Sequence, residues 1–188
     1  MVYTIIMSKS REFTKPPRDI VVLLHNIRSV QNVGAILRTC ECLGIQQCYA
    51  TGYTPNLECA TDGTNAPILP HVKAKLAHEL HRSALGAEEL VRLSYRTDIN
   101  KLVSQLKQSG YRLVGLEQNE RSVVLAYYQA PSKIALLLGE EVHGIINSLL
   151  EQCDDLVEIP MFGQKESYNV SVATGIALYS LVISSLPQ

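Results

Sequence analysis

The sequence predicts an α/β fold in which a mainly parallel sheet is flanked by helices. The run Asp19–His25 is apolar throughout its interior, as is typical of a strand buried on both faces of a sheet. Further apolar runs alternate with segments of helical periodicity, and such alternation favours parallel strands joined by helical crossovers. The length of 188 residues, with 46% hydrophobic and 19% charged residues, suits one domain with a substantial core.

The predicted elements follow from apolar spacing and from the residues that end each one. Segment 32–43 is expected to be a helix with apolar side chains on one face, and Gly44 ends it. Asp98 is a suitable cap for a second helix, and Gly110 stops that helix after residue 109. The other expected elements are strands at 45–50, 112–116, 134–138 and 156–159, and helices at 69–85, 145–152 and 169–186.

We expect a loose arm, residues 1–19, followed by a single domain, residues 20–188. The arm ends at Pro16 and Pro17 and has no basic leader, so a secretory signal is not expected. No apolar run approaches the ~20 residues that span a bilayer, so no membrane partner is expected. The five cysteines include one close pair, Cys40 and Cys42, which we expect in core or structural positions. Their odd number favours reduced thiols in a cytoplasmic protein over a disulfide framework or a metal site.

Charge is distributed unevenly, although the net charge is only −1. Residues 1–133 hold 16 basic and 11 acidic side chains, whereas residues 134–188 hold one basic and seven acidic ones. Basic patches can contact phosphates, and a solvated surface is the alternative for each patch. The histidines of the second patch are spaced for a metal site, but a solvated helix face is the favoured interpretation. The patches are Lys9, Arg11, Lys15 and Arg18, and then His71, Lys73, Lys75, His78, His81 and Arg82.

Ligands of parallel α/β sheets bind outside the carboxyl ends of the strands, which directs attention to the loops 26–32, 117–121, 139–144 and 160–169. In the first of these regions, Asn32 is a suitable helix cap, and Gly34 permits a close approach of backbone or ligand. Arg38 follows Gly34 by one helical turn, where it can clamp a phosphate or stabilise an oxyanion. The alternative is a surface arginine paired with Glu41. His25, beside this region, is a further candidate near the substrate.

Two further regions have the same design of a strand followed by a polar loop. Gly139 and Gly144 bracket a tight turn in which Glu141 can accept N–H bonds, and an ordinary acidic turn is the alternative. Neither a dinucleotide fingerprint nor a P-loop is present. The segment 158–173 is longer than an ordinary link and reaches a helix N-terminus. Capping alone explains one of Ser167 and Asn169. The helix that follows is apolar nearly all round, so it is buried or part of a subunit interface.

Together the three regions resemble the signature motifs of the SpoU/TrmH class of SPOUT RNA 2′-O-ribose methyltransferases. The resemblance covers about residues 20–186. Tyr168 departs from the family pattern, which has leucine at this position. The matching residues are Asn26, Asn32, Gly34 and Arg38 in the first motif, Gly139, Glu141 and Gly144 in the second, and Ile159, Pro160, Met161, Gly163, Ser167, Asn169 and Ser171 in the third.

The resemblance implies transfer of a methyl group from S-adenosyl-L-methionine to a ribose 2′-hydroxyl of RNA, with tRNA favoured over rRNA. It also implies a C-terminal trefoil knot and a homodimer formed through the C-terminal helix region, with Arg38 acting across the dimer interface. The implied catalytic group is Arg38, supported by Asn32, Glu141, Ser167 and Asn169. The implied cofactor-binding residues are Leu116, Gly139, Ile159, Met161, Ser167 and Tyr168. If the backbone of Tyr168 makes the contact, its departure from leucine matters little.

Two other functions remain open on the sequence. One is a non-catalytic module that binds RNA or cofactor, although both Arg38 and Asn169 are present. The other is a nucleotide-binding enzyme on an ordinary doubly wound sheet. RNA is expected to be recognised through the dimer surface, with the basic patches as contacts and with specificity in the segment 52–85.

Overall fold

The structure is a computed structural model that describes residues 16, 18–58 and 66–184. Within these residues, seven strands form one sheet in the order β3-β2-β1-β6-β4-β7-β5, and every strand pair is parallel. The α/β fold with a parallel sheet is thereby confirmed. The strands are β1 (Asp19–His25), β2 (Gln47–Thr51), β3 (Arg92–Arg96), β4 (Arg112–Leu116), β5 (Val123–Val124), β6 (Lys133–Leu138) and β7 (Asp155–Glu158).

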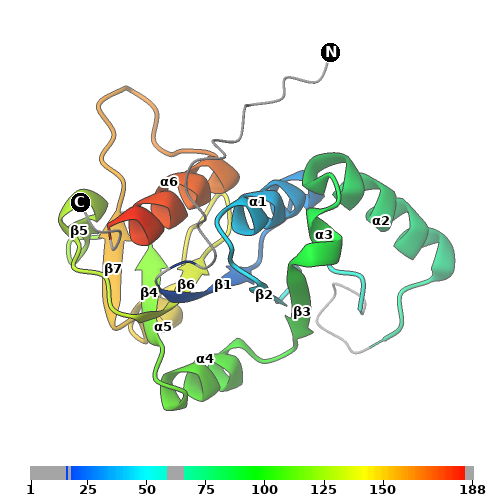
Figure 1. Cartoon of the computed structure of the whole chain (residues 1–188), viewed down its shortest axis with the longest axis horizontal. Coiled ribbons are helices and arrows are strands. Elements are labelled where there is room, and N and C mark those ends of the chain that lie inside the picture. Colours follow the sequence, from blue (N-terminus) through cyan, green and yellow to red (C-terminus); the bar gives the residue numbers. More distant parts are fainter. Residues whose placement is uncertain (1–15, 17, 59–65, 185–188) are drawn as a thin grey trace.

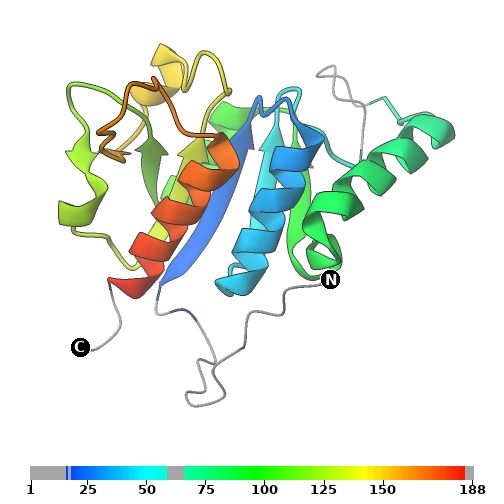
Figure 2. The same cartoon turned by 90° about the horizontal axis from the view of Figure 1, so that it is seen from above.

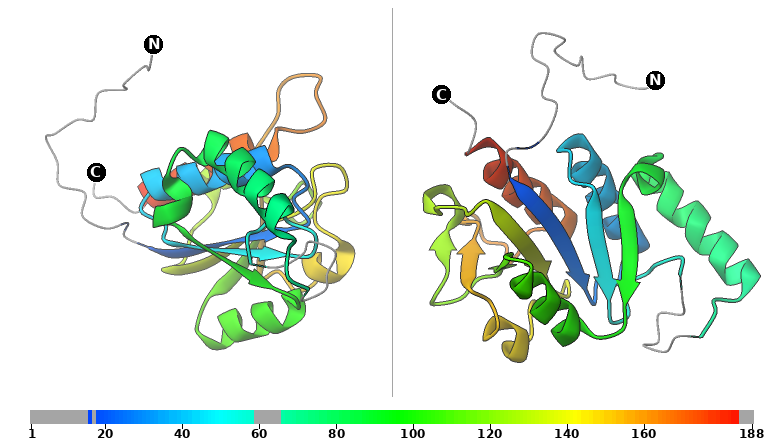
Figure 3. Two further views of the ribbon diagram at one scale, coloured as in Figure 1. Left: turned by 90° about the vertical axis from the view of Figure 1, so that its right-hand side faces the viewer. Right: turned by 60° about the horizontal axis from the view of Figure 1, so that its bottom comes forward.

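Helices cover both faces of the sheet (Figure 1). One face carries α1 (Val30–Cys42), α2 (Pro70–Ala84), α3 (Ala87–Leu90) and α6 (Val170–Ile183). The other face carries α4 (Ile99–Gln108) and α5 (Asn147–Leu150), as the left view of Figure 3 shows. A short 3-10 helix, η1 (Leu125–Tyr127), follows β5. Residues 1–15, 17 and 185–188 lie outside the described part, so the expected arm and the domain limits stay predictions. The trefoil knot also stays a prediction.

The inner strand β1 contributes to two separate cores, which explains its continuous apolar run. Ile20, Val22 and Leu24 pack into the core beneath α1 and α6. Val21 and Leu23, which alternate with them, pack into the core beneath α4 and α5. Because successive side chains of a strand point to opposite faces, a strand covered on both sides needs apolar residues at every position.

The helices α1 and α2 pack unusually closely at Gly34. A side-chain carbon at this position would lie 2.8 Å from the carbonyl oxygen of Leu80 and would also collide with the Ser83 hydroxyl. The close approach that the sequence predicts at Gly34 is therefore made by the backbone of α2. Beyond this contact α2 extends past the edge of the sheet (Figure 2).

Several boundaries differ from the sequence predictions. Helix α1 begins at Val30, because Ser29 accepts the capping bond from the backbone of Asn32 at 3.3 Å, so the expectation of Asn32 as the cap is wrong. Helix α5 is shorter than expected, and β3 was not predicted, because arginines at both of its ends hide a strand at the sheet edge. Cys40 is buried, but Cys42 is exposed because it lies about 200° further round the helix.

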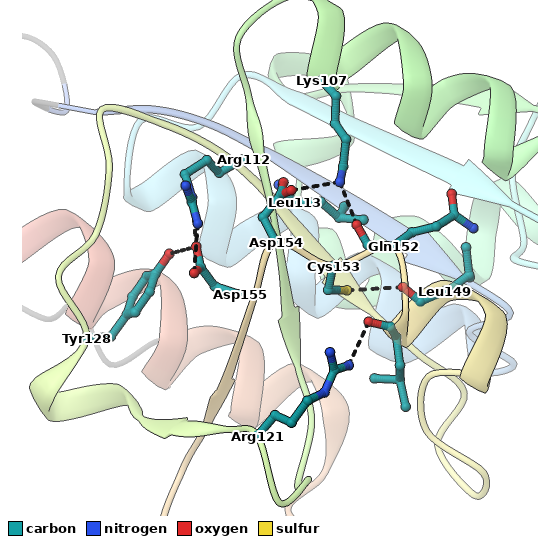
Figure 4. A network of polar contacts seen from close by, with 11 residues as sticks. Lys107, Arg112, Leu113, Arg121, Tyr128, Leu149, Gln152, Cys153, Asp154 and Asp155 are labelled. Atoms are coloured by element: carbon teal, nitrogen blue, oxygen red, sulfur yellow. Dashed lines mark hydrogen bonds and ion pairs between the residues drawn. The ribbon is translucent and has the colours of Figure 1, made fainter.

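A polar network fixes the amino ends of β4 and β7 (Figure 4). Asp155 accepts two bonds from Arg112, both at 2.9 Å, and one from the Tyr128 hydroxyl at 2.8 Å. Burial would raise the pKa of Asp155, but the bonds from Arg112 and Tyr128 outweigh it and lower that pKa. Lys107 pairs with Asp154 at 2.8 Å, which ties α4 to the same edge. These contacts anchor the two strands whose opposite ends carry the loops described next.

Across the described residues no helix is long and apolar enough to cross a membrane. The same residues contain no group of three or more histidine, cysteine or acidic side chains placed to hold a metal ion.

Candidate active site

A cavity of about 330 Å³ lies at the carboxyl ends of β4, β6 and β7, where the topology of a parallel sheet places ligands. Its walls are the loops that follow these three strands and the first turn of α6. All the residues that the sequence resemblance assigns to cofactor binding line it, namely Leu116, Gly139, Ile159, Met161, Ser167 and Tyr168. The structure therefore gathers these residues in one place, and their binding role stays a prediction.

The lining of the cavity combines apolar and acidic side chains. The apolar part includes Leu116, Leu138, Ile159 and Met161. The acidic part consists of Glu117, Glu140, Glu141, Glu158 and Glu166. Among the described residues that line the cavity there is no lysine or arginine. A ligand with a flat apolar part, hydroxyl groups and a positive charge suits this lining, whereas a ligand with several phosphates does not.

The glycines of segment 139–144 serve the turn itself. Glu140 and Gly144 form a backbone bridge, with N–H···O distances of 3.0 and 2.9 Å. Gly144 has φ +67°, and a side-chain carbon on Gly139 would lie 2.5 Å from the backbone nitrogen of Ile145. The tight bend predicted from the sequence is therefore formed by backbone packed on backbone, which only glycine permits at these two positions.

Glu117 is a structural support of this turn that the sequence analysis did not identify. One carboxylate oxygen accepts the backbone N–H of Ile145 at 2.7 Å, and the other accepts that of Gln118 at 3.0 Å. It thereby joins the end of β4 to the turn after β6. An acidic residue directly after an apolar strand was the available signal, but its partner lies 28 residues away and is not visible from the sequence.

A chain of hydrogen bonds joins all three sequence regions. The carboxylate of Glu141 accepts bonds from the backbone of Arg28 (3.0 Å) and Ser29 (3.2 Å) and from the Asn32 amide (3.0 Å). The Asn32 oxygen in turn accepts a bond from the Asn169 amide at 3.1 Å. Burial would raise the pKa of Glu141, but its hydrogen bonds, led by the bond from the Arg28 backbone, outweigh it and lower that pKa. Glu141 is thus held in its charged form.

In the third region, Asn169 and Ser167 have different positions. Asn169 is the N-cap of α6, because its oxygen accepts the backbone N–H of Ser171 at 2.9 Å and the hydroxyl of Ser171 at 2.6 Å. Ser167 instead lines the cavity. The sequence predicts that capping explains one of these two residues, and in the structure that residue is Asn169. Ser167 is therefore available to a ligand.

Arg38 lies apart from the cavity within one chain. It is exposed on α1, and no described residue forms a hydrogen bond or ion pair with it. The alternative pairing with Glu41 is therefore not formed. Its guanidinium, which has no partner among the described residues, is carried by the helix that packs against α6.

His25 is buried and has a local structural role. Its Nδ1 lies 2.8 Å from the Thr51 hydroxyl and its Nε2 lies 3.2 Å from the Asn26 amide. Burial lowers the pKa of His25, which favours the neutral ring. Asn26, with φ +60°, also accepts the backbone N–H of Tyr53 at 3.3 Å. These bonds tie the end of β1 to the end of β2, beside the site but outside its cavity.

Residues 19–179 match the family described as SpoU rRNA Methylase. The tRNA (guanosine(18)-2′-O)-methyltransferase of Borreliella burgdorferi is 28% identical over 162 residues, which are 86% of this chain and 65% of that protein. The 23S rRNA (guanosine-2′-O-)-methyltransferase RlmB of Neisseria meningitidis is 32% identical over 166 residues, which are 88% of this chain and 58% of that protein. This chain thus spans less than two thirds of either relative.

Solved structures share the fold. The TrmH/SpoU tRNA modifying enzyme of A. aeolicus superposes with a TM-score of 0.72 at 25% identity, over 90% of this chain and 76% of that one. The AdoMet-bound rRNA methyltransferase from Sinorhizobium meliloti superposes with a TM-score of 0.75 at 21% identity, over 92% of this chain and 59% of that one. The expected likeness of the fold to SpoU methyltransferases is thereby confirmed.

Proposed function

The chain belongs to the SpoU rRNA Methylase family, and from this premise we propose that it transfers a methyl group from S-adenosyl-L-methionine to a ribose 2′-hydroxyl of tRNA or rRNA. Similarity to enzymes that act on tRNA and on 23S rRNA supports RNA as the substrate class. We retain tRNA as the first choice of substrate and the cytoplasm as the place of reaction.

The lining of the cavity is the observation that carries this proposal. Its apolar walls suit an adenine ring, and its carboxylates suit ribose hydroxyls and a positively charged sulfur. When bound, the cofactor supplies a methyl group that is already activated by the sulfonium charge. The absence of lysine and arginine among the described lining residues argues against a dinucleotide ligand, because phosphates need compensating charge or donors.

The residues of the site position two reactants rather than supply a metal or a covalent nucleophile. The new bond would join the ribose oxygen to the methyl carbon as the carbon–sulfur bond breaks. The electron pair of that bond would stay on sulfur, which becomes a neutral thioether, and the hydroxyl proton would pass to water. Correct in-line placement supplies a large share of such an acceleration. Glu117 and the chain Glu141–Asn32–Asn169 hold the loops in register. The guanidinium of Arg38 stabilises negative charge on the hydroxyl or on the adjacent phosphate.

We further propose that Arg38 acts on the cavity of a second copy of the chain. An exposed apolar stripe on α6 supports a homodimer, because Val172, Ile176, Tyr179 and Ile183 are all exposed at spacings of four, three and four residues. Helix α6 lies beside α1, which carries Arg38 (Figure 1). Pairing two copies through α6 would cover the stripe and bring each Arg38 near the partner molecule.

Transfer of radiolabelled methyl groups to separated tRNA and rRNA tests the activity. Arg38→Ala should lower transfer by about 100-fold or more, as removal of a charge-stabilising donor does in other enzymes, and should leave binding of S-adenosylhomocysteine unchanged. Arg92→Ala is the matched control, because Arg92 is an exposed arginine on the edge strand β3, which contributes no residue to the cavity lining. Wild-type turnover by Arg38→Ala would disprove the role of Arg38.

Mixing variants tests whether Arg38 acts in trans. A heterodimer of Arg38→Ala with Glu141→Gln contains one cavity with an intact Glu141 that faces an intact Arg38 from the other copy. Mixed and refolded protein should therefore regain part of the transfer that each variant lacks alone. No regain in a verified heterodimer would place Arg38 in its own subunit's site.

Calorimetry, read together with the transfer assay, separates the two alternative functions. Binding of S-adenosylhomocysteine without transfer to any RNA would favour the non-catalytic module. Binding of a dinucleotide in preference to S-adenosylhomocysteine would favour the nucleotide-binding enzyme.

A further inference from the structure

We propose that the outer face of α2 is a docking stripe for the phosphate backbone of the RNA, an inference that rests on the proposed function. The stripe consists of His71, Lys75, His78 and Arg82. The stripe lies outside the cavity and outside the apolar stripe of α6. The proposal therefore gives a partner to a helix that takes part in neither the cavity nor the proposed dimer interface.

The spacing of the four residues places them on one line along the helix. Intervals of four, three and four residues return to the same side of an α-helix, and the line is about 16 Å long at 1.5 Å per residue. All four side chains are exposed. Leu80 and Ala84, on the opposite side, are buried against α1. The stripe therefore faces solvent, and its length spans several phosphates of a nucleic-acid strand.

The described residues compensate the charge of this face poorly. Lys75 has one distant ion pair, with Glu79 at 3.9 Å, and its side chain is 78% exposed. For His71, His78 and Arg82 the described residues provide no hydrogen-bond or ion-pair partner. Of the two glutamates of α3, Glu88 is bound to His81, which lies off the stripe, and Glu89 forms no ion pair with a described residue. Such an uncompensated line of basic groups is complementary to a polyanion.

Packing among the described residues does not account for the first half of α2. Residues 69–75 are all exposed, including the apolar Leu69 and Val72, and the helix extends past the edge of the sheet (Figure 2). Pro70 sets its first turn, but short helical turns without tertiary contacts gain little stability of their own. A helix that projects in this way offers its surface to an external partner.

The stripe lies in the same helical layer as the other parts of the proposed site. In the left view of Figure 3, α6, α1 and α2 lie over one face of the sheet. Arg38, on α1, is also exposed without a described partner. Phosphates that flank a ribose held near Arg38 can therefore continue along this layer onto α2. The stripe would hold RNA without reading its bases, because contacts to phosphates position a nucleic acid and carry no sequence information.

Replacing the whole stripe tests the proposal. The variant carries His71→Gln, Lys75→Gln, His78→Gln and Arg82→Gln. Its Kd for the RNA that the wild type methylates should rise about 10-fold or more at low salt, because two permanent charges and two histidines are lost. The slope of log K against log salt concentration, which is negative, should decrease in magnitude by about 2 from the loss of Lys75 and Arg82 alone. KM for RNA should rise while kcat at saturating RNA stays within about twofold.

The control variant, Arg92→Gln with Lys101→Gln, removes two exposed basic residues that lie outside α2, and should bind RNA with the wild-type salt slope. Unchanged binding of S-adenosylhomocysteine by the stripe variant shows that its fold is intact. If the wild-type enzyme methylates RNA and the stripe variant binds that RNA with unchanged Kd and salt slope, the docking proposal is wrong and the proposed function stands. A wild-type protein that transfers no methyl group to any RNA overturns the proposed function, and the stripe with it.

Discussion

Glu141 is the residue on which the three regions of the site depend. Its two carboxylate oxygens accept three N–H groups, two from the backbone after β1 and one from Asn32. Asn32 in turn accepts a hydrogen bond from Asn169 at the start of α6. A carboxylate at this point accepts every bond offered to it, which no neutral side chain of similar size can do.

We expect Glu141→Gln to weaken the protein and its activity together. The glutamine amide would point N–H groups at N–H donors, and each unmatched bond costs about 1–3 kcal/mol. The free energy of unfolding should fall by about 2 kcal/mol, and methyl transfer by about 10-fold or more. Denaturant titration and transfer assays measure the two effects. Glu151→Gln, at an exposed glutamate with no described side-chain partner, should change neither quantity.

The packing of α1 against α2 shows why the first region contains a glycine, Gly34. Gly34 is where α1 meets the backbone of α2, so it sets the separation of the two helices. The same helix pair presents Arg38 on one side and the stripe of α2 on another. An error of packing at Gly34 would therefore displace two proposed contact surfaces at once.

Gly34→Ala should destabilise the fold despite the higher helix propensity of alanine. The added carbon would lie 2.8 Å from the Leu80 carbonyl oxygen, and overpacking of this kind costs about 1–3 kcal/mol. Gly175→Ala in α6 is the matched control, because its added carbon meets only Thr39 at an ordinary 3.8 Å. That variant should be neutral or up to about 1 kcal/mol more stable. Equal effects of the two substitutions on thermal unfolding would contradict this account.

Two unpredicted elements show where reasoning from periodicity ends. The short strands β3 and β5 lie at the two edges of the sheet, where only part of each strand is covered. Strand β3 has an arginine at each end, and β5 is only two residues long, so neither has the continuous apolar run that identified β1. The glycines that end α1 and α4 were predicted correctly, because Gly44 and Gly110 have positive φ, a local property that does not depend on the fold.

Across the whole molecule, the acidic and basic residues that the sequence separates also lie on different surfaces. The acidic C-terminal part supplies Glu140, Glu141, Glu158 and Glu166 to the cavity. The basic N-terminal part supplies Arg38 and the stripe of α2. An acidic cavity that suits a cationic ligand and the proposed basic docking stripe thus occupy different parts of one chain.

Disrupting the apolar stripe of α6 should convert a dimer into a monomer. We expect Ile176→Asp to place a charge in the proposed interface and to lower methyl transfer by about 10-fold or more, because the Arg38 of each copy would be lost to the other. Light scattering after gel filtration measures the mass, and circular dichroism checks the fold. Leu90→Asp is the control, because Leu90 is an exposed leucine on α3, away from α6. A dimeric Ile176→Asp protein would contradict the proposed interface.

The sequence by itself determined the parallel α/β class, the strand buried on both faces and the three polar regions that meet at one edge. These depend on local patterns: continuous apolar runs, helical spacing and the residues that end each element. Only the tertiary structure decided which side chains meet. Glu141 contacts Asn32 across 109 residues, and Asn32 contacts Asn169 across 137. Such contacts depend on strand order, with β6 placed between β1 and β4, and no periodicity along a chain records that order.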